Sequence, residues 1–252
     1  MTRTTMRPAV RAVTFDFWDT IVAATEGSGT GMRRLQTERF ARTLADAGHP
    51  VSADELVEAF EANWARFEER WLANTGQYTP ADSVGFIAER VGVELTDDLR
   101  DALIDGFRQV GEDVGLQMGA GIEESLATLQ AAGVRLGIVC DVGLTSAPTL
   151  RRRLEELGLL HMFDAWAFSD ETGWFKPSAR AFEPALAGLG IDDPAVAAHV
   201  GDNRRTDVAG ALALGMIAVR FTGFHDRSPE TGPEADHVID DHRKLPALLG
   251  VA

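Results

Sequence analysis

The second half of the chain alternates between short apolar runs and helical patterns, and this alternation limits the fold more than any other feature. The predicted strands span residues 134–139, 165–168, 196–200, 216–221 and 237–239, and helices are predicted near 121–132, 146–157, 180–189 and 207–214. An apolar run before Asp16 predicts a further strand of the same sheet. This pattern is typical of the α/β class, with a doubly wound parallel sheet, right-handed crossovers and helices on both faces.

A long helical segment separates the first predicted strand from the others. It carries three helix starts: a capping box at Ser52 and Glu55, a cap at Thr79 before a first-turn proline, and Thr96 ahead of two aspartates. Four helices are expected there, and no convincing strand. We therefore predict a core domain from residues 1–22 and 115–252, with an inserted α-helical domain from residues 23–114.

Apolar side chains recur at steps of three and four residues in this insertion. They include Leu56, Phe60, Trp64, Phe67 and Trp71. Because such spacing gives a helix one buried face, we interpret these residues as the core of a helix bundle and not as a ligand site.

The charge of the chain argues against a nucleic-acid partner. The 252 residues carry a formal net charge of -15, whereas recognition of a phosphate backbone begins with a basic surface. The single cysteine, Cys140, supports neither a disulfide within the chain nor a cysteine zinc site. Residues 1–8 are polar and Arg11 interrupts the next apolar run, so neither a signal peptide nor a membrane span is predicted. We expect a cytoplasmic protein with no membrane partner, and no pattern indicates an oligomeric state.

Acidic residues follow two of the predicted strands. Asp16 comes directly after the first strand, within Phe15-Asp16-Phe17-Trp18-Asp19-Thr20, where open α/β sheets gather their chemistry. Its position suggests a nucleophile. The strand ending at Val200 runs into a tight turn flanked by Asp202 and Asp207, and paired carboxylates suit Mg²⁺. Helix capping accounts for Asp207 equally well.

Two other strand ends carry residues of interest. Cys140-Asp141-Val142-Gly143 reads as a turn whose backbone N–H groups can face an anion. Cys140 is interpreted as a small packed residue, since no partner for thiol catalysis is evident. Lys176 stands in the loop after residues 165–168; an exposed lysine is the ordinary case, but Pro177 fixes the backbone and can hold the ammonium inward.

Together these four strand ends resemble the motifs of the haloacid dehalogenase-like (HAD) hydrolase superfamily, in order and in context. The stretch from Phe15 to Thr20 resembles the first motif, Ile138-Val139-Cys140-Asp141 the second, Lys176-Pro177 the third, and Gly201-Asp202 through Asp207 the fourth. The resemblance covers the whole core and implies a Rossmann-like fold. The helical insertion is similar to the cap of the superfamily's commonest subclass, the helical-cap or C1 group.

The resemblance implies a phosphatase that acts on a small phosphorylated metabolite. Asp16 would attack phosphorus and form an aspartyl-phosphate, which water later hydrolyses. The cofactor implied is Mg²⁺, held by Asp16, the backbone carbonyl of Trp18, Asp202 and Asp207.

The same resemblance implies a set of phosphate contacts. Lys176 would pair with both Asp16 and the phosphate. Thr20 and the backbone around Cys140 and Asp141 would donate hydrogen bonds to the phosphate oxygens.

Two positions depart from the superfamily pattern. Two residues after the nucleophile, these phosphatases usually carry a second aspartate as acid and base; here Trp18 can serve as neither. Asp19 is the nearest candidate, but residues three apart in an extended segment point to opposite faces, so we expect its side chain to face away. Cys140 replaces the usual serine or threonine and is a poorer hydrogen-bond donor.

Three alternatives to a phosphatase are considered. An aromatic residue two after the nucleophile resembles the 2-haloacid dehalogenases, whose aspartate attacks carbon without a metal, but Asp202 and Asp207 would then repel a carboxylate substrate. Phosphonate cleavage through a lysine imine is excluded, because the insertion from Ile21 to Met118 contains no lysine. A catalytically weak member that binds a phosphorylated ligand or a protein partner is the third alternative, motivated by Trp18.

Other charged residues are less specific. Candidate anion contacts are Arg33, Arg34, Arg39, Arg204 and Arg205, most of which we expect to be solvated. The histidines show no metal-ligand spacing. His199 is interpreted as a wall of the site or as a core histidine with its hydrogen bonds made.

Overall fold

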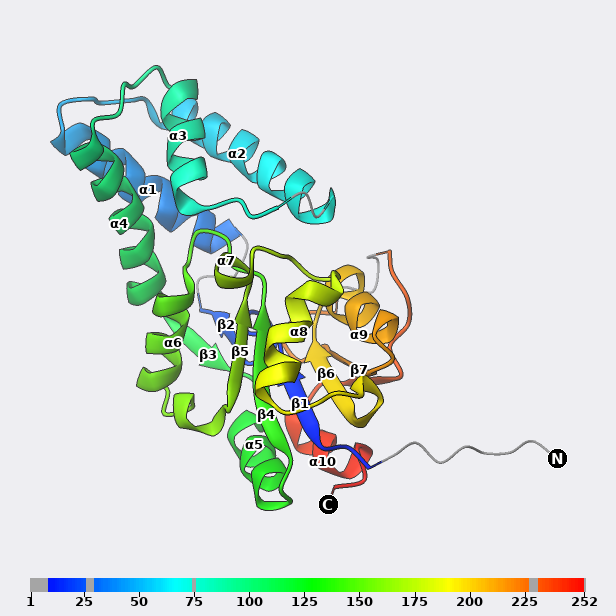
Figure 1. Ribbon diagram of the computed structural model, residues 1–252. Helices are drawn as coiled ribbons and strands as arrows, with labels where there is room; N and C mark the ends of the chain where they lie inside the picture. Colours follow the sequence, from blue (N-terminus) through cyan, green and yellow to red (C-terminus); the bar gives the residue numbers. More distant parts are fainter. Residues whose placement is uncertain (1–8, 26–29, 74–75, 227–230, 252) are drawn as a thin grey trace. The chain divides into compact units, whose positions relative to one another are not determined.

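The structure is a computed structural model that describes residues 9–25, 30–73, 76–226 and 231–251 (Figure 1). Contacts divide the chain into two compact units, with divisions after residues 23, 116, 141 and 156. The first unit holds the chain up to residue 23, residues 117–141 and the chain from 157 onward; the second, called the helical unit, holds residues 24–116 and 142–156. The predicted core domain, residues 1–22 and 115–252, includes the segment 142–156, whereas the contacts assign this segment to the helical unit. Its polar start at residues 1–8 lies outside the described residues.

A six-stranded sheet forms the centre of the first unit. Its strands, in spatial order, are β5 (Ala165–Phe168), β4 (Arg135–Cys140), β1 (Ala12–Phe15), β6 (Ala197–Gly201), β7 (Ile217–Phe221) and β8 (His237–Ile239). All pairings between these strands are parallel, which confirms the predicted α/β fold. The order runs outward in both directions from β1, and such a reversal is where open α/β sheets bind ligands. The carboxyl ends of β4, β1 and β6 therefore lie side by side.

Helices and short turns cover the sheet. They are α5 (Ile122–Ala131), η1 (Leu160–Met162), α7 (Ser169–Thr172), α8 (Ala179–Gly188), η2 (Pro194–Val196), η3 (Arg204–Val208), α9 (Ala209–Ala213), η4 (His242–Lys244) and α10 (Leu245–Leu248). The helix predicted over 207–214 begins earlier, with the π-helical turn η3. Its start is capped by Asn203, whose side chain accepts a hydrogen bond from Arg205 N.

Strand alternation sends the side chains of β1 to two different faces. Ala12 lies in a core cluster with Phe182 of α8 and Ala211 of α9, so these helices cover one face. Phe15 lies on the other face and contacts Phe163 and His242, which follow η1 and begin η4. Each face of the strand that leads to Asp16 is therefore packed.

The helical unit contains the expected four helices of the insertion and one more. They are α1 (Thr30–Asp46), α2 (Ala53–Ala73), α3 (Pro80–Arg90), α4 (Asp97–Asp113) and α6 (Ala147–Glu156). The three predicted helix starts are confirmed: Ser52 and Glu55 bond reciprocally, Thr79 and Asp82 form a capping box, and Thr96 caps α4. Among the described residues, no helix is both long enough and apolar enough to cross a membrane.

One short sheet was missed by the prediction. β2 (Val22–Ala24) and β3 (Leu116–Met118) pair where the chain passes between the units. Each has three residues, which is too few for a recognisable alternation.

The helical unit has an aromatic core. Phe40, Phe60 and Phe107 pack around each other with ring centroids 5.4–6.1 Å apart, and Leu56 is fully buried beside them. The bundle-core interpretation is confirmed for Leu56 and Phe60.

The same interpretation is wrong for the other three aromatics of the row. Trp64, Phe67 and Trp71 remain partly exposed and stack on one another along α2. Their spacing identifies one face of a helix, but it does not say whether another element covers that face.

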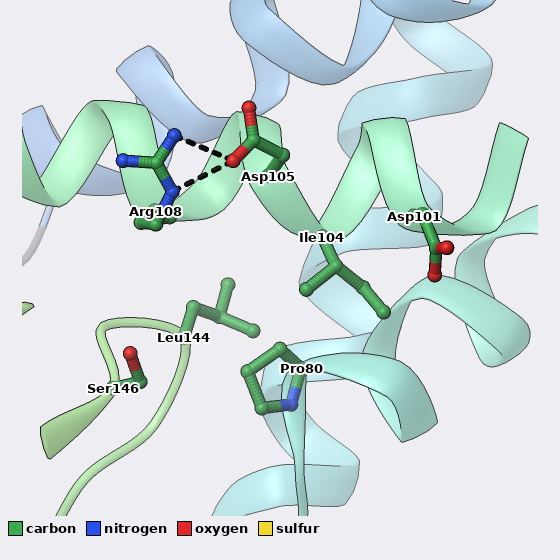
Figure 2. A pocket seen from close by; sticks show the side chains of 7 residues that line it. All are labelled: Pro80, Asp101, Ile104, Asp105, Arg108, Leu144 and Ser146. Atoms are coloured by element: carbon green, nitrogen blue, oxygen red, sulfur yellow. Dashed lines mark hydrogen bonds and ion pairs between the residues drawn. The ribbon is translucent and has the colours of Figure 1, made fainter. Parts of the chain in front are cut away.

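The segment 142–156 packs on α4. Arg153 of α6 donates to the carbonyls of Glu112 and Val114 at 2.7 and 2.8 Å. Gly111 allows the close approach, because a Cβ there would lie 2.7 Å from the Thr145 methyl carbon. A pocket of about 300 Å³ lies between Asp101, Ile104, Asp105 and Arg108 of α4 and Pro80, Leu144 and Ser146 (Figure 2).

Two glycines of the helical unit provide a matched test of this packing. Gly85→Ala in α3 meets nothing within 4 Å, so the higher helix propensity of alanine should raise the free energy of unfolding by about 0.5–1 kcal/mol. Gly111→Ala should lower it, because the new methyl collides with Thr145. Urea unfolding of both variants measures whether each free energy of unfolding rises or falls. A stabilised Gly111→Ala variant would contradict the packing described.

Candidate active site

Asp16 lies at the carboxyl end of the central strand. Its backbone N–H donates to Val200 O of β6 at 2.8 Å, which continues the parallel ladder one residue past β1. The side chain of Asp16 is 9% exposed. A carboxylate so deeply buried requires a compensating charge.

That charge is the ammonium of Lys176. Nζ donates to Asp16 Oδ1 at 2.7 Å, to Asp207 Oδ1 at 2.6 Å and to the carbonyl of Val139 at 3.1 Å, so each of its three protons has an acceptor. Lysine occurs only at positions 176 and 244, while all other fixed cations are arginines. A compact ammonium suits a site where three acceptors converge on one atom, which a planar guanidinium does not.

Asp207 is held from three sides. Besides Lys176, it accepts from His199 Nε2 at 3.1 Å and from the backbone N–H of Asn203 at 2.9 Å. Gly201 makes room for it, because a Cβ at that position would overlap the Asp207 carboxyl. Three donors on one carboxylate fix its orientation.

A buried hydrogen-bonded chain returns from Asp207 to β1, the strand that leads to Asp16. The Nδ1 atom of His199 lies 2.9 Å from Thr14 Oγ1, and Thr14 stands two residues before Asp16 on the same face of β1. Since Nε2 of His199 faces a carboxylate, it carries the proton and Nδ1 accepts from Thr14. The interpretation of His199 as a core histidine with its hydrogen bonds made is confirmed by these contacts.

The charges of this cluster shift one another's pKa. Burial raises the pKa of Asp16 to about 7, assisted by the neighbouring Asp207 and opposed by Lys176. Burial also acts on Asp207, but Lys176 and His199 outweigh it and hold the pKa of Asp207 below its ordinary value. Burial disfavours the charged form of Lys176, yet the surrounding carboxylates raise its pKa well above the usual range. One ammonium is therefore shared by more negative charge than it can neutralise.

A third buried carboxylate completes the cluster. Oxygen atoms of Asp16, Asp202 and Asp207 lie within 4.8 Å of one another, and Asp202 is 6% exposed. Hard oxygen ligands and an excess of negative charge are what Mg²⁺ prefers, so this donor set fits that ion.

The segment after Asp16 is a turn, so the expectation of an extended segment is wrong. Asp19 adopts a left-handed backbone with φ of 55°, and the turn closes where Ile21 N and Val22 N both donate to the Phe17 carbonyl, at 3.0 and 3.1 Å. The Asp19 carboxylate is buried, with Oδ1 3.8 Å from His225 Nε2. Trp18 packs edge-on against Phe17, with ring centroids 5.0 Å apart.

The predicted phosphate-binding residues lie around this turn. Thr20 is fully buried, and its hydroxyl has no hydrogen-bond partner within the part of the chain that the structure describes. Cys140 is buried at the end of β4, where burial raises the pKa of its thiol well above the usual range. Asp141 accepts from the backbone N–H of Lys176 at 2.9 Å, so its carboxylate positions the lysine loop.

Most of the candidate arginines are engaged elsewhere. Arg34 pairs with Glu38, Arg39 bonds Gln109 and Asp113, and Arg204 bonds Glu234 and two carbonyls. Arg33 lies over the Trp64 ring, with its guanidinium carbon 4.1 Å from the centroid.

Two supporting residues were missed by the prediction. Thr14 is a polar residue inside an apolar strand and lies two positions before Asp16. This spacing in the sequence already indicated that the two side chains point to the same side. His242 gave no such signal, because it belongs to no motif and its partner, Thr20, is 222 positions away in the sequence.

The model of the family described as "Hydrolase: haloacid dehalogenase-like hydrolase" matches residues 10–215. The chain belongs to this family. The match spans all four strand ends that carry the acidic and basic residues described above.

Relatives of known structure or activity fit this assignment. The chain is 27% identical over 253 residues to the glyceraldehyde 3-phosphate phosphatase of Methanothermobacter thermautotrophicus, covering 95% of this chain and 100% of the relative. A HAD phosphatase from Thermococcus onnurineus superposes with a TM-score of 0.64 at 24% identity, covering 96% and 99% of the two chains. A 2-haloacid dehalogenase from Pseudomonas syringae gives 0.66 at 20% identity, covering 96% and 98%. The HAD fold alone therefore does not choose between the two chemistries.

The charge balance at Lys176 can be tested without any substrate. Lys176→Met should lower the free energy of unfolding by about 3–5 kcal/mol in EDTA-treated protein, because it leaves Asp16 and Asp207 buried without their cation. Adding Asp207→Asn to that variant should recover part of the loss. The control is Lys244→Met, since Lys244 pairs with Asp240 at the surface and should change stability by less than about 0.5 kcal/mol. Equal effects of the two single substitutions in urea unfolding would refute the assigned role of Lys176.

Proposed function

We propose that this HAD hydrolase is a Mg²⁺-dependent phosphatase of a small phosphorylated metabolite. The observation that carries the proposal is the site itself: a buried carboxylate at the switch point of the sheet, one ammonium shared between Asp16 and Asp207, and Asp202 beside them. The full-length relative named as a glyceraldehyde 3-phosphate phosphatase supports this chemistry.

In the proposed reaction Asp16 is the nucleophile. One of its carboxylate oxygens attacks phosphorus, a P–O bond to Asp16 forms, and the bond from phosphorus to the substrate oxygen breaks. Water then attacks phosphorus of the aspartyl-phosphate and releases inorganic phosphate and the free carboxylate. When bound, Mg²⁺ supplies positive charge between the two anions; Asp16, Asp202, Asp207 and the Trp18 carbonyl would hold it.

The other residues bind and orient. The Lys176 N–H that donates to Asp16 can donate instead to a phosphoryl oxygen once the Asp16 oxygen has become an ester, so the lysine stays an ammonium in both states. The Thr20 hydroxyl is buried with no partner among the described residues, and we propose that it donates to the phosphate. The N–H groups after Cys140 and Asp141 would add further donors.

The acid and base are the unusual part of this proposal. Trp18 occupies the place of the usual aspartate and cannot transfer a proton. Asp19 is the nearest carboxylate in the sequence, and we propose it only as a candidate. The turn that carries it bends the chain, but its Oδ1 lies toward His225.

A 2-haloacid dehalogenase remains the second candidate, because Trp18 and the fold agree with it. The buried carboxylates Asp202 and Asp207 argue against it, since they would repel a carboxylate substrate. We further propose that the helical unit is the cap that selects the substrate.

The central test is metal-dependent phosphate release. EDTA-treated protein should release no phosphate from p-nitrophenyl phosphate or from a panel of phosphorylated metabolites, and added Mg²⁺ should restore release. Asp16→Asn should reduce kcat by at least about a thousandfold, since it removes the nucleophile, while Asp19→Asn should reduce it far less. Turnover of 2-chloropropionate without metal, in the absence of phosphate release, would establish the dehalogenase instead.

A second test measures how the lack of an aspartate at position 18 affects the rate for different leaving groups. Without a general acid, the wild type should cleave p-nitrophenyl phosphate, whose leaving group needs no proton, much faster than an alkyl phosphate. Trp18→Asp should raise kcat for the alkyl ester by about a hundredfold and leave the aryl ester within about threefold. Trp18→Ala is the matched control, because it removes the ring without adding a carboxylate. Similar wild-type rates for the two esters, with no gain for the alkyl ester in Trp18→Asp, would show that an acid is already present.

A further inference from the structure

His242 is buried beneath the turn that carries Thr20. Its side chain is fully buried and stacks on Phe221 of β7, with ring centroids 4.1 Å apart and planes 15° from parallel. It also meets Phe15, the last residue of β1, with centroids 6.2 Å apart. The imidazole therefore fills the face of the sheet opposite to the one occupied by Thr14 and His199.

The His242 side chain makes one polar contact from these apolar surroundings. Nε2 of His242 lies 3.0 Å from the backbone carbonyl of Thr20, and because a carbonyl only accepts, the imidazole donates. Nδ1 is buried with no partner in the described residues. The bond joins the C-terminal segment of the chain to the turn after the nucleophile.

The neutral imidazole suits this arrangement. Burial lowers the pKa of His242 to about 4, opposed by the Thr20 carbonyl and by the carboxylate of Asp241. With one proton on Nε2, the ring makes its single hydrogen bond to Thr20.

Gly119 permits the approach. A Cβ at this position would lie 2.9 Å from Thr20 O and 3.0 Å from His242 Nε2, so any side chain would enter the space of the hydrogen bond. The same segment is tied in from both sides, since Gly119 N donates to Ile21 O at 2.8 Å and His242 N donates to Ala120 O at 2.9 Å. Three segments distant in sequence thus converge on the Thr20–Ile21 peptide.

We propose that His242 is a positioning residue for phosphate transfer, which fixes the Thr20–Ile21 peptide and thereby aims the Thr20 hydroxyl. The inference rests on the proposed function for the role of Thr20, but not for the contact itself. A histidine that only filled the core would need the stack on Phe221 and no bond to the turn. The hydrogen bond and the glycine that clears its path give the side chain a second role.

A double-mutant cycle tests whether His242 acts through Thr20. His242→Phe keeps an aromatic ring on Phe221 and removes the donor, and it should lower kcat/KM for p-nitrophenyl phosphate about fivefold to tenfold. Thr20→Val removes the hydroxyl at nearly constant volume. If His242 acts through that hydroxyl, His242→Phe in the Thr20→Val background should cost less than about twofold. Losses that multiply in the double variant would overturn the proposal.

Two further variants separate positioning from simple destabilisation. Gly119→Ala leaves His242 in place but intrudes on its bond, so it should reproduce the loss of His242→Phe and add little to it. His161→Phe, at an exposed histidine of η1, is the matched control and should leave kcat/KM unchanged. A Gly119→Ala variant with full activity would count against the hydrogen bond as the acting contact.

Hydrogen exchange measured by mass spectrometry tests the contact without any substrate. In His242→Phe, amides in peptides covering residues 17–23 and 117–121 should exchange at least about fivefold faster, while those of β4 should stay as in the wild type. Equal acceleration throughout the first unit would mean general loosening and would overturn the proposal. If the wild type releases no phosphate, the proposed function fails, and the exchange experiment alone still decides whether His242 holds the turn.

Discussion

The placement of one buried ammonium governs the first unit. Lys176 lies between Asp16 and Asp207 and donates its third N–H to the Val139 carbonyl of β4, so the residue after β1, the turn η3 and β4 are all bonded to one atom. Removing these charges from water is costly, and only close, well-oriented contacts offset that cost. The chain as a whole is also acidic, with a formal net charge of -15, so the carboxylates clustered at this site add to an existing excess of negative charge. The three carboxylates of this cluster form a donor set that fits a divalent cation.

Histidines contact both faces of β1, the strand that leads to Asp16. On one face, Thr14 is linked through His199 to Asp207, the same carboxylate that Lys176 holds. On the other, Phe15 lies against His242, which reaches forward to Thr20. Asp16 therefore emerges from a strand whose neighbours before and after it are each anchored. Such anchoring would hold the proposed nucleophile within the small tolerance that reaction geometry allows.

Much of the fold could be predicted from the sequence, because each strand of the sheet is an apolar run bounded by polar turns. The boundaries of β4, β5, β6 and β8 differ from the predicted ones by one residue or less. The site was harder to predict, since burial of a lysine depends on partners 31 and 160 positions away. The left-handed turn at Asp19 was missed because an aspartate adopts this backbone only when its surroundings require it. Aromatic spacing in α2 likewise identified a face without showing what covers it.

The division of the chain also bears on how this fold can change. The helical unit is built from two segments, and α6 belongs to it through Arg153 and the close contact at Gly111. The helical unit therefore cannot be exchanged as one continuous segment. Replacing residues 24–116 alone would remove α4, the helix on which α6 packs. A domain transplanted from another protein must also include a segment equivalent to residues 142–156, which directly follow Asp141 in the chain. Recombination that exchanges the helical unit of such a chain must therefore preserve or replace both segments together.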